Sequence, residues 1–256
     1  MKGWQRVVEG VALGRAHEFN SAFYALRPGG WRDYVTLLHP PYTLWHLSYV
    51  VLGAAIAPNL HWDRLAASLA AFLLAMGLGA HALDELSGRP LKTRIAGETL
   101  RAIAVLGLCG AIALGIAGAV LVTPWLFAFI CFGAFVAPAY SLEWFGGRFH
   151  SDIWFALSWG SFPLVTSYWV NAEEMGAAAV VGGVAAFFLS LAQRTLSHRV
   201  RAVRRKVSGI EGKVRYADGG VEEIDRGWAM ATEERALKLL TVSVVAVSVT
   251  VLLAGT

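Results

Sequence analysis

The sequence predicts an all-α integral membrane protein with about seven transmembrane helices, and three observations support this prediction. Of the 256 residues, 56% are hydrophobic and only 16% are charged, whereas about a quarter of the residues in a soluble domain carry charge. The charges are also unevenly placed, because residues 195–235 hold sixteen of the forty. Several other runs of about twenty residues contain one charge or none, and a helix of that length crosses the hydrocarbon core of a bilayer.

Seven apolar spans follow from a window of about twenty residues moved along the chain. They cover residues 41–58, 64–83, 102–122, 124–142, 152–170, 175–193 and 237–254. Each is expected to be helical, because a backbone that faces lipid must satisfy its own hydrogen bonds. The predicted regions are an N-terminal cytoplasmic or interfacial segment, a six-helix membrane domain, a basic cytoplasmic segment with a hairpin and a C-terminal transmembrane helix. Their limits are 1–40, 41–193, 194–236 and 237–256.

The distribution of positive charge predicts the orientation in the membrane. Arg64 is the only Lys or Arg that this topology places on the side opposite the N-terminus. The protein is expected in the cell's inner membrane. By the positive-inside rule its N-terminus lies in the cytoplasm and its C-terminus on the outer side of that membrane. The same rule accounts for the net charge of +4 and the pI of 9.2, so membrane lipids are expected as partners and nucleic acid is not. Glu9 and Arg15 interrupt the first apolar stretch, so no cleavable signal peptide is expected.

The segment 194–236 has its own organisation. Its basic run, residues 194–206, is expected to continue the sixth helix out of the membrane. Residues 212–217 and 221–224 then alternate on either side of a turn, Asp218-Gly219-Gly220, which is typical of a β-hairpin. A lone hairpin is marginally stable in water, so it is expected to pack on the bundle. Residues 208–225 are a candidate docking surface for a protein partner.

Ionisable residues at the ends of the spans are the candidates for function, because each costs on the order of 2.5 kcal/mol or more inside a membrane. His39 and His46 are seven residues apart and therefore share one helical face. His81, Asp84 and Glu85 lie within about one turn, with both carboxylates on the face of the imidazole. Others on the same side of the membrane are Glu143, His150, Asp152, Gln193, Arg194 and His198.

Two chemistries fit these residue types. Carboxylates at a helix end hold Mg²⁺, which bridges to substrate phosphates, and the candidates are Asp84 and Glu85. A mixed set of imidazoles and carboxylates suits iron, zinc or manganese instead. The candidate ligands for a metal are His39, His46, His81, Asp84 and Glu85, with His150 or His198 as additional ligands of a transition metal.

Four short motifs occur in a characteristic order between residues 27 and 200. They are Arg27-Pro28 before the first span, Arg89-Pro90-Leu91 after the second, Tyr140-Ser141 at the end of the fourth, and Trp159-Gly160-Ser161-Phe162-Pro163 in the fifth. In this arrangement the chain resembles the UbiA superfamily of intramembrane prenyltransferases. The resemblance implies a bundle of helices around a central cavity that opens to lipid. It also implies transfer of a polyprenyl group from its diphosphate to a lipid or aromatic acceptor, with Mg²⁺ held by two Asp-rich motifs.

The acidic motifs of that family are largely replaced in this chain. When Glu85 is placed on the second Asp of the first motif, His81 takes the place of the Asn and Arg89 that of the last Asp. The region of the second motif, residues 193–205, contains no acid. Asp84 and Glu85 are therefore expected to hold a single Mg²⁺, and basic residues are expected to bind the diphosphate in place of the second metal.

Three hypotheses remain open at this point. The first is a UbiA-like prenyltransferase, in which the resemblance implies catalytic roles for His81, Asp84 and Glu85. Its expected substrate-binding residues are Arg89, Lys92, Arg94, Tyr140, Arg148, Arg194, His198 and Arg199. The second is the same fold with a transition-metal site for redox or hydrolytic chemistry on a lipid. The third is a non-enzymatic lipid-binding or assembly subunit.

Overall fold

The computed structural model describes residues 20–255. The predicted cytoplasmic N-terminus and the signal-peptide interpretation fall on residues outside this range. The helices, π-helical segments and strands, in chain order, are α2 Trp31–Leu37, α3 Pro40–Ala55, α4 Trp62–Phe72, η1 Leu73–Ala80, α5 His81–Leu86, α6 Gly97–Leu121, α7 Leu126–Ser141, α8 Trp144–Gly147, α9 Asp152–Phe155, η2 Ala156–Ser161, α10 Phe162–Ala172, α11 Ala177–Lys206, β1 Gly212–Arg215, β2 Val221–Ile224 and α12 Trp228–Ala254.

Four helices in the described part of the chain are long and apolar enough to cross a membrane. They are Trp62–Leu86, Gly97–Leu121, Ala177–Lys206 and Trp228–Ala254. The all-α membrane prediction is therefore confirmed, but the number of seven spans is not. The other three predicted spans coincide with helical segments, of which α3 and α7 have 16 residues each. At 1.5 Å per residue such a helix is about 24 Å long, shorter than a hydrocarbon core of about 30 Å.

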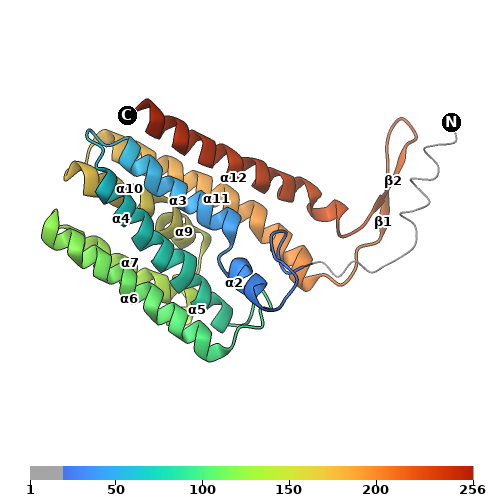
Figure 1. Cartoon of the computed structure of the whole chain (residues 1–256). Helices are drawn as coiled ribbons and strands as arrows, with labels where there is room; N and C mark the ends of the chain where they lie inside the picture. Colours follow the sequence, from blue (N-terminus) through green and yellow to red (C-terminus); the bar gives the residue numbers. More distant parts are fainter. Residues whose placement is uncertain (1–19, 256) are drawn as a thin grey trace.

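The long helices run side by side in one bundle, and α2 lies at one of its ends (Figure 1). The loop between α5 and α6 and the start of the hairpin lie at that end, whereas the C-terminus of α12 lies at the other. Helix α3 packs against both α10 and α12, and α11 packs against η2 and α12. A buried aromatic pair, Trp45 and Tyr49, packs on Leu164 of α10 and Ala186 of α11. These contacts close the middle of the bundle.

The contact between α3 and α10 depends on a glycine. A Cβ atom at Gly53 would lie 2.1 Å from the backbone oxygen of Leu164 and 3.0 Å from the backbone nitrogen of Tyr168. Real Cβ atoms essentially never approach so closely, and backbone atoms cannot move aside as the end of a side chain can. Small residues allow two membrane helices to approach in this way. Gly53 therefore sets the distance between α3 and α10.

We expect Gly53→Ala to lower the free energy of unfolding by about 2–3 kcal/mol, because the added methyl group forces two packed helices apart. Thermal unfolding of the purified protein in detergent measures the change. Gly97→Ala is a matched control, because no atom lies within 4 Å of the position that a Cβ would take at Gly97. Equal stability of the two variants would contradict the role assigned to Gly53.

The predicted β-hairpin is confirmed, but its expected packing on the bundle is wrong. β1 and β2 pair antiparallel, with Gly212 opposite Ile224 and Arg215 opposite Val221. Most residues of both strands are exposed, and the hairpin stands clear of the helices in Figure 1. Side-chain contacts across the hairpin, such as Lys213 with Glu223 at 3.7 Å, stabilise it locally. The basic run before it is helical to Lys206, as predicted.

Candidate functional site

A polar cavity of about 290 Å³ lies beside the α5–α6 loop, which contributes Ser87, Gly88 and Pro90 to its wall. Helix α3, the η1–α5 segment, the end of α7, the α9–η2 segment and α11 each contribute to its wall. Both π-helical segments reach it, η1 through Met76 and η2 through Trp159, and π-helical turns frequently occur at functional sites. Its polar or ionisable lining residues are Tyr24, His39, Tyr42, His46, His81, Asp84, Ser87, Tyr140, Ser141, Glu143, His150, Gln193, Arg194, Ser197, Arg201 and Arg205.

Three arginines of α11 give the polar cavity a positive wall. Arg194, Arg201 and Arg205 are seven and four residues apart and so share one helical face. The Nε of Arg194 donates to Asp152 Oδ1 at 2.8 Å, and its guanidinium lies 5.2 Å from the centre of the Phe155 ring.

The other two arginines donate to backbone oxygens rather than to carboxylates. Arg201 donates from Nε to the oxygen of Ser197 at 3.3 Å, and Arg205 donates from Nε to the oxygen of Ser21 at 3.2 Å. Within the described residues neither forms an ion pair with an acid. A guanidinium has five N–H donors, so both retain donors and charge for an anionic ligand.

The two adjacent carboxylates of α5 have different surroundings. Asp84 lines the polar cavity and interacts electrostatically with Arg194 and Arg201. Glu85 is 0% exposed and does not line the cavity. Its oxygens accept hydrogen bonds from the backbone nitrogen of Leu91 at 2.9 Å and from the nitrogen and hydroxyl of Thr93 at 2.8 and 2.9 Å. Glu85 therefore holds the α5–α6 loop, and only Asp84 faces the site.

Four histidines line the polar cavity: His39, His46, His81 and His150. The rings of His39 and His81 stack at 4.0 Å with an angle of 13° between their planes. Burial, together with the neighbouring His81, holds the pKa of His39 well below its usual value, so His39 is neutral at physiological pH. His150 stacks on Tyr140 at 4.4 Å. His39 and His46 line the same cavity, but the predicted shared helical face is wrong, because α3 begins at Pro40 and His39 precedes it with a positive φ of 48°.

The N-terminal part of the described chain covers one side of this cavity. Tyr24 lies 5.5 Å from the rings of both His39 and Tyr42, and burial raises its pKa. Ser21 donates to the backbone oxygen of Leu91 at 2.9 Å, and its own backbone oxygen receives the hydrogen bond from Arg205. The segment is thereby tied to both the α5–α6 loop and α11.

Of the eight predicted substrate-binding residues, Tyr140 and Arg194 line the polar cavity and six do not. Arg89 donates to the backbone oxygens of Thr93 and Ile95 at 3.1 and 2.7 Å, which secures its own loop. Arg199 is paired with Glu233 of α12 at 3.0 Å. The remaining four are exposed away from the cavity: Lys92, Arg94, Arg148 and His198.

Some lining residues were not predicted. Arg201 and Arg205 belong to the basic run 194–206, and their spacing of seven and eleven residues from Arg194 was the signal that could have found them. Tyr24 reaches the cavity from a segment with no regular secondary structure. No periodicity marks such a residue in the sequence.

The metal prediction receives no geometric support from the described residues. Among them, no group of three or more His, Cys, Asp or Glu side chains is placed to hold a metal ion. The predicted set of His39, His46, His81, Asp84 and Glu85 is divided, because the Glu85 carboxylate is engaged with backbone N–H groups outside the cavity. The donor set at the cavity therefore does not fit the paired carboxylates expected for Mg²⁺ or a mixed set for iron, zinc or manganese.

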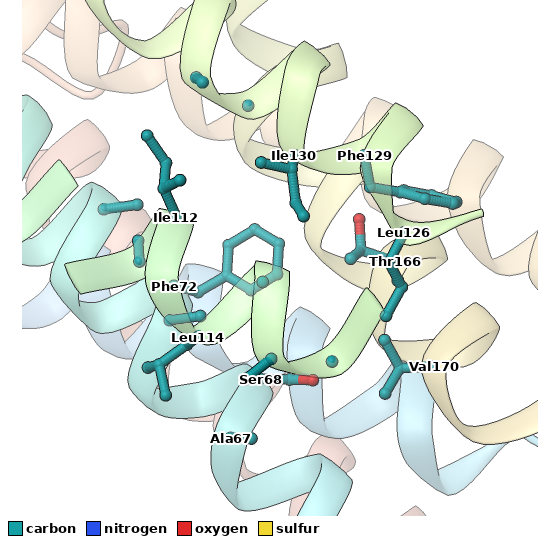
Figure 2. Close-up of a pocket in the computed structure, with 18 of the residues that line it drawn as sticks. Ala67, Ser68, Phe72, Ile112, Leu114, Leu126, Phe129, Ile130, Thr166 and Val170 are labelled. Carbon is teal, nitrogen blue, oxygen red and sulfur yellow. The ribbon is translucent and has the colours of Figure 1, made fainter. Parts of the chain in front are cut away.

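A second, apolar pocket of about 270 Å³ lies between α4, η1, α6, α7 and α10. Figure 2 shows Phe72 and Leu114, with Ile130 of α7 and Val170 of α10, around this space. Met76 and Trp159 line both the apolar pocket and the polar cavity. These two side chains belong to the wall of each space, so the polar cavity and the apolar pocket are adjacent.

Comparison of the chain with protein-family models, curated proteins and solved structures finds no match. The fold and the site define the class to which the protein belongs. It is an α-helical multi-pass membrane protein with a basic polar cavity that adjoins an apolar pocket.

Proposed function

We propose that this protein binds an isoprenoid lipid by a diphosphate head group and transfers its isoprenoid chain to an acceptor, as a UbiA-like prenyltransferase does. The observation that carries the proposal is the wall that the two spaces share at Met76 and Trp159. The head group lies among the arginines of α11, and the chain lies in the apolar pocket. An amphiphile with an anionic head satisfies both at once.

Transfer of an isoprenoid group needs charge stabilisation where the diphosphate leaves. The C–O bond to the diphosphate breaks, and the diphosphate departs with both electrons of that bond. Arg194, Arg201 and Arg205 stabilise the developing negative charge through preorganised N–H donors. The acceptor then forms the new bond to the isoprenoid carbon and releases a proton to Asp84, the α5 carboxylate that lines the same cavity. No step is assigned to Mg²⁺, because the residues present do not form its ligand set.

Purified protein in lipid nanodiscs tests this function with farnesyl diphosphate as the probe and diphosphate release as the readout. We expect saturable binding, and we expect Asp84→Asn to slow turnover about a hundredfold through loss of the proton acceptor while binding is retained. Glu98→Gln is the matched control, because Glu98 is an exposed acid on α6 paired with Arg101. Absence of binding, together with an Asp84→Ala variant that keeps every measured activity, would overturn the proposal.

The proposed orientation places the polar cavity on the cytoplasmic side of the cell's inner membrane. The basic end of α11, which carries Arg204, Arg205 and Lys206, supports this orientation by the positive-inside rule. The C-terminus of α12 then lies outside. A reporter enzyme that is active only in the cytoplasm, fused after Gly255, is expected to be inactive. Activity of that fusion would contradict the orientation.

A second candidate function is a non-enzymatic assembly subunit, which the free-standing hairpin favours. Residues 208–225 present an exposed surface away from the helices that a protein partner could contact. Deletion of this segment separates the two functions. If the deletion variant loses a copurifying partner but turns over farnesyl diphosphate as the full chain does, the hairpin has a docking role in addition to catalysis. If the partner is lost and neither the full chain nor the deletion variant shows measurable turnover, the assembly function is supported.

A further inference from the structure

A group of exposed positive charges lies on α2, on the segment just before it and on the α5–α6 loop. We call it the basic surface, and its residues are Arg27, Arg32, Lys92 and Arg94. Within the described residues, none of these four side chains forms an ion pair with an acid. None of them lines the polar cavity either. The site proposed above therefore leaves this surface unexplained.

The buried carboxylate of Asp33 holds the parts of the basic surface together. Asp33 is only 3% exposed. Its oxygens accept hydrogen bonds from the backbone nitrogens of Gly29 and Arg94, both at 3.0 Å. Arg32 directly precedes Asp33, and Arg27 lies two residues before Gly29. Charges from two distant parts of the chain are thereby fixed on one surface.

The basic surface lies where the chain leaves the membrane. The α5–α6 loop joins Trp62–Leu86 to Gly97–Leu121, and both helices are long and apolar enough to cross a bilayer. A short loop between two such helices lies at the membrane surface. Because Asp33 ties α2 to Arg94 of this loop, α2 lies at the same surface. Figure 1 shows α2 and the loop at one end of the bundle.

Two aromatic side chains beside these charges fit the head-group layer of a bilayer. Trp31 and Tyr34 of α2 are 67% and 46% exposed, and the guanidinium of Arg32 lies 5.8 Å from the centre of the Trp31 ring. Tryptophan and tyrosine are enriched at the level of the lipid head groups, where their rings lie beside apolar chains and their polar atoms meet water. Aromatic and basic side chains together therefore match a lipid surface.

We infer that the basic surface is a binding site for the head group of an anionic phospholipid. Guanidinium groups match the geometry of phosphate oxygens, and Arg32 and Arg94 supply two of them. A zwitterionic head group brings its own cation, which offsets the attraction, whereas an anionic one does not. The basic surface therefore selects anionic lipid. The inference is separate from the transfer reaction, because no residue of the basic surface lines the polar cavity.

Tryptophan quenching by brominated lipid tests the site where it is proposed to lie. The full-length protein is placed in phosphatidylcholine nanodiscs that contain a minor fraction of either brominated phosphatidylglycerol or brominated phosphatidylcholine with the same acyl chains. The chain has 10 tryptophans, so the signal of Trp31 is taken as the difference from a Trp31→Phe variant, relative to nanodiscs without bromine. We expect phosphatidylglycerol to reach half-maximal quenching of Trp31 at about a fivefold lower fraction, the effect of about one Lys or Arg near an anionic surface. Equal quenching by the two lipids would overturn the inference.

The double variant Arg32→Gln/Arg94→Gln is expected to reduce this preference to less than about twofold. It leaves the hydrogen bond from the backbone nitrogen of Arg94 to Asp33 in place, so the surface keeps its shape. Lys213→Gln/Arg215→Gln is the matched control, because it removes the same charge from exposed residues of β1 and is expected to keep the full preference. If both double variants lose the preference equally, general attraction to the protein's net charge explains it, and the assigned site is wrong.

Discussion

The double variant Arg201→Gln/Arg205→Gln is expected to bind farnesyl diphosphate about a thousandfold more weakly than the unmodified protein. Each guanidinium contributes a charge-assisted hydrogen bond of about 1.5–3 kcal/mol, and about 1.4 kcal/mol is a factor of ten in affinity. Neither arginine is neutralised by an acid of the described chain, so the positive charge is available to the ligand. Equilibrium binding in nanodiscs at one fixed salt concentration measures the effect, because salt screens it.

Single variants divide this loss between the two arginines. Arg201 is the cleaner test, because its Nε hydrogen bond goes to Ser197 of its own helix, whereas Arg205 also holds the backbone of Ser21. Arg201→Lys keeps the charge but loses the planar fork of donors, and we expect an intermediate affinity.

Arg199→Gln is the matched control on the same helix. Its side chain is exposed and paired with Glu233 outside the cavity, so its removal is expected to change the affinity less than about threefold, in line with the small energies of surface ion pairs. If Arg199→Gln weakens binding as much as Arg201→Gln, general electrostatic attraction explains the affinity, and the polar cavity is not the binding site.

The positions of the helices could be predicted from the sequence because hydropathy reports directly on burial in lipid. The predicted span 102–122 corresponds to α6, Gly97–Leu121, and the span 237–254 lies within α12. The predicted helix ends were less accurate than the helix positions. The first turn of α6 and the first turns of α12 contain polar residues, so these helices begin before their apolar segments. Hydropathy also could not separate helices of full membrane length from the 16-residue α3 and α7.

The polar cavity could be predicted only in part, since a position in the sequence does not give the direction of a side chain. Asp84 and Glu85 are adjacent, and successive side chains on a helix point about 100° apart. One carboxylate therefore enters the cavity while the other turns to the α5–α6 loop. Asp84 and Glu85 are three and four residues after His81, so the spacing alone puts both carboxylates on the helix face of His81. What decides between them is the path of the loop that follows, which the composition does not reveal.

That loop has a strained backbone. Arg89 and Lys92 have positive φ angles of 54° and 58°, a conformation that costs non-glycine residues on the order of 1 kcal/mol each. The Glu85 carboxylate offsets this cost by accepting three hydrogen bonds from Leu91 and Thr93. The guanidinium of Arg89 adds two more to the same stretch of chain. The geometry of the loop thus depends on one buried acid.

We expect Glu85→Ala to lower the free energy of unfolding by about 3–5 kcal/mol. The substitution leaves two buried backbone N–H groups and a hydroxyl without their acceptor, at a cost of about 1–3 kcal/mol for each group that cannot reach water. Thermal unfolding in detergent measures the loss. Glu85→Gln keeps one carbonyl acceptor, so its free energy of unfolding is expected to lie between those of the unmodified protein and Glu85→Ala. Glu98→Ala is the matched control, because that acid is exposed on α6 and paired only with Arg101.

The sign of the change distinguishes a structural role for Glu85 from a catalytic one. Residues in active sites are often unfavourable for stability, so their removal leaves stability unchanged or raises it. A residue that anchors a loop lowers stability when it is removed, and activity falls with it through misplacement of the neighbouring Asp84. If Glu85→Ala is as stable as Glu98→Ala but loses turnover, Glu85 acts in the reaction, and the assignment of Asp84 as the sole carboxylate of α5 in the site is wrong.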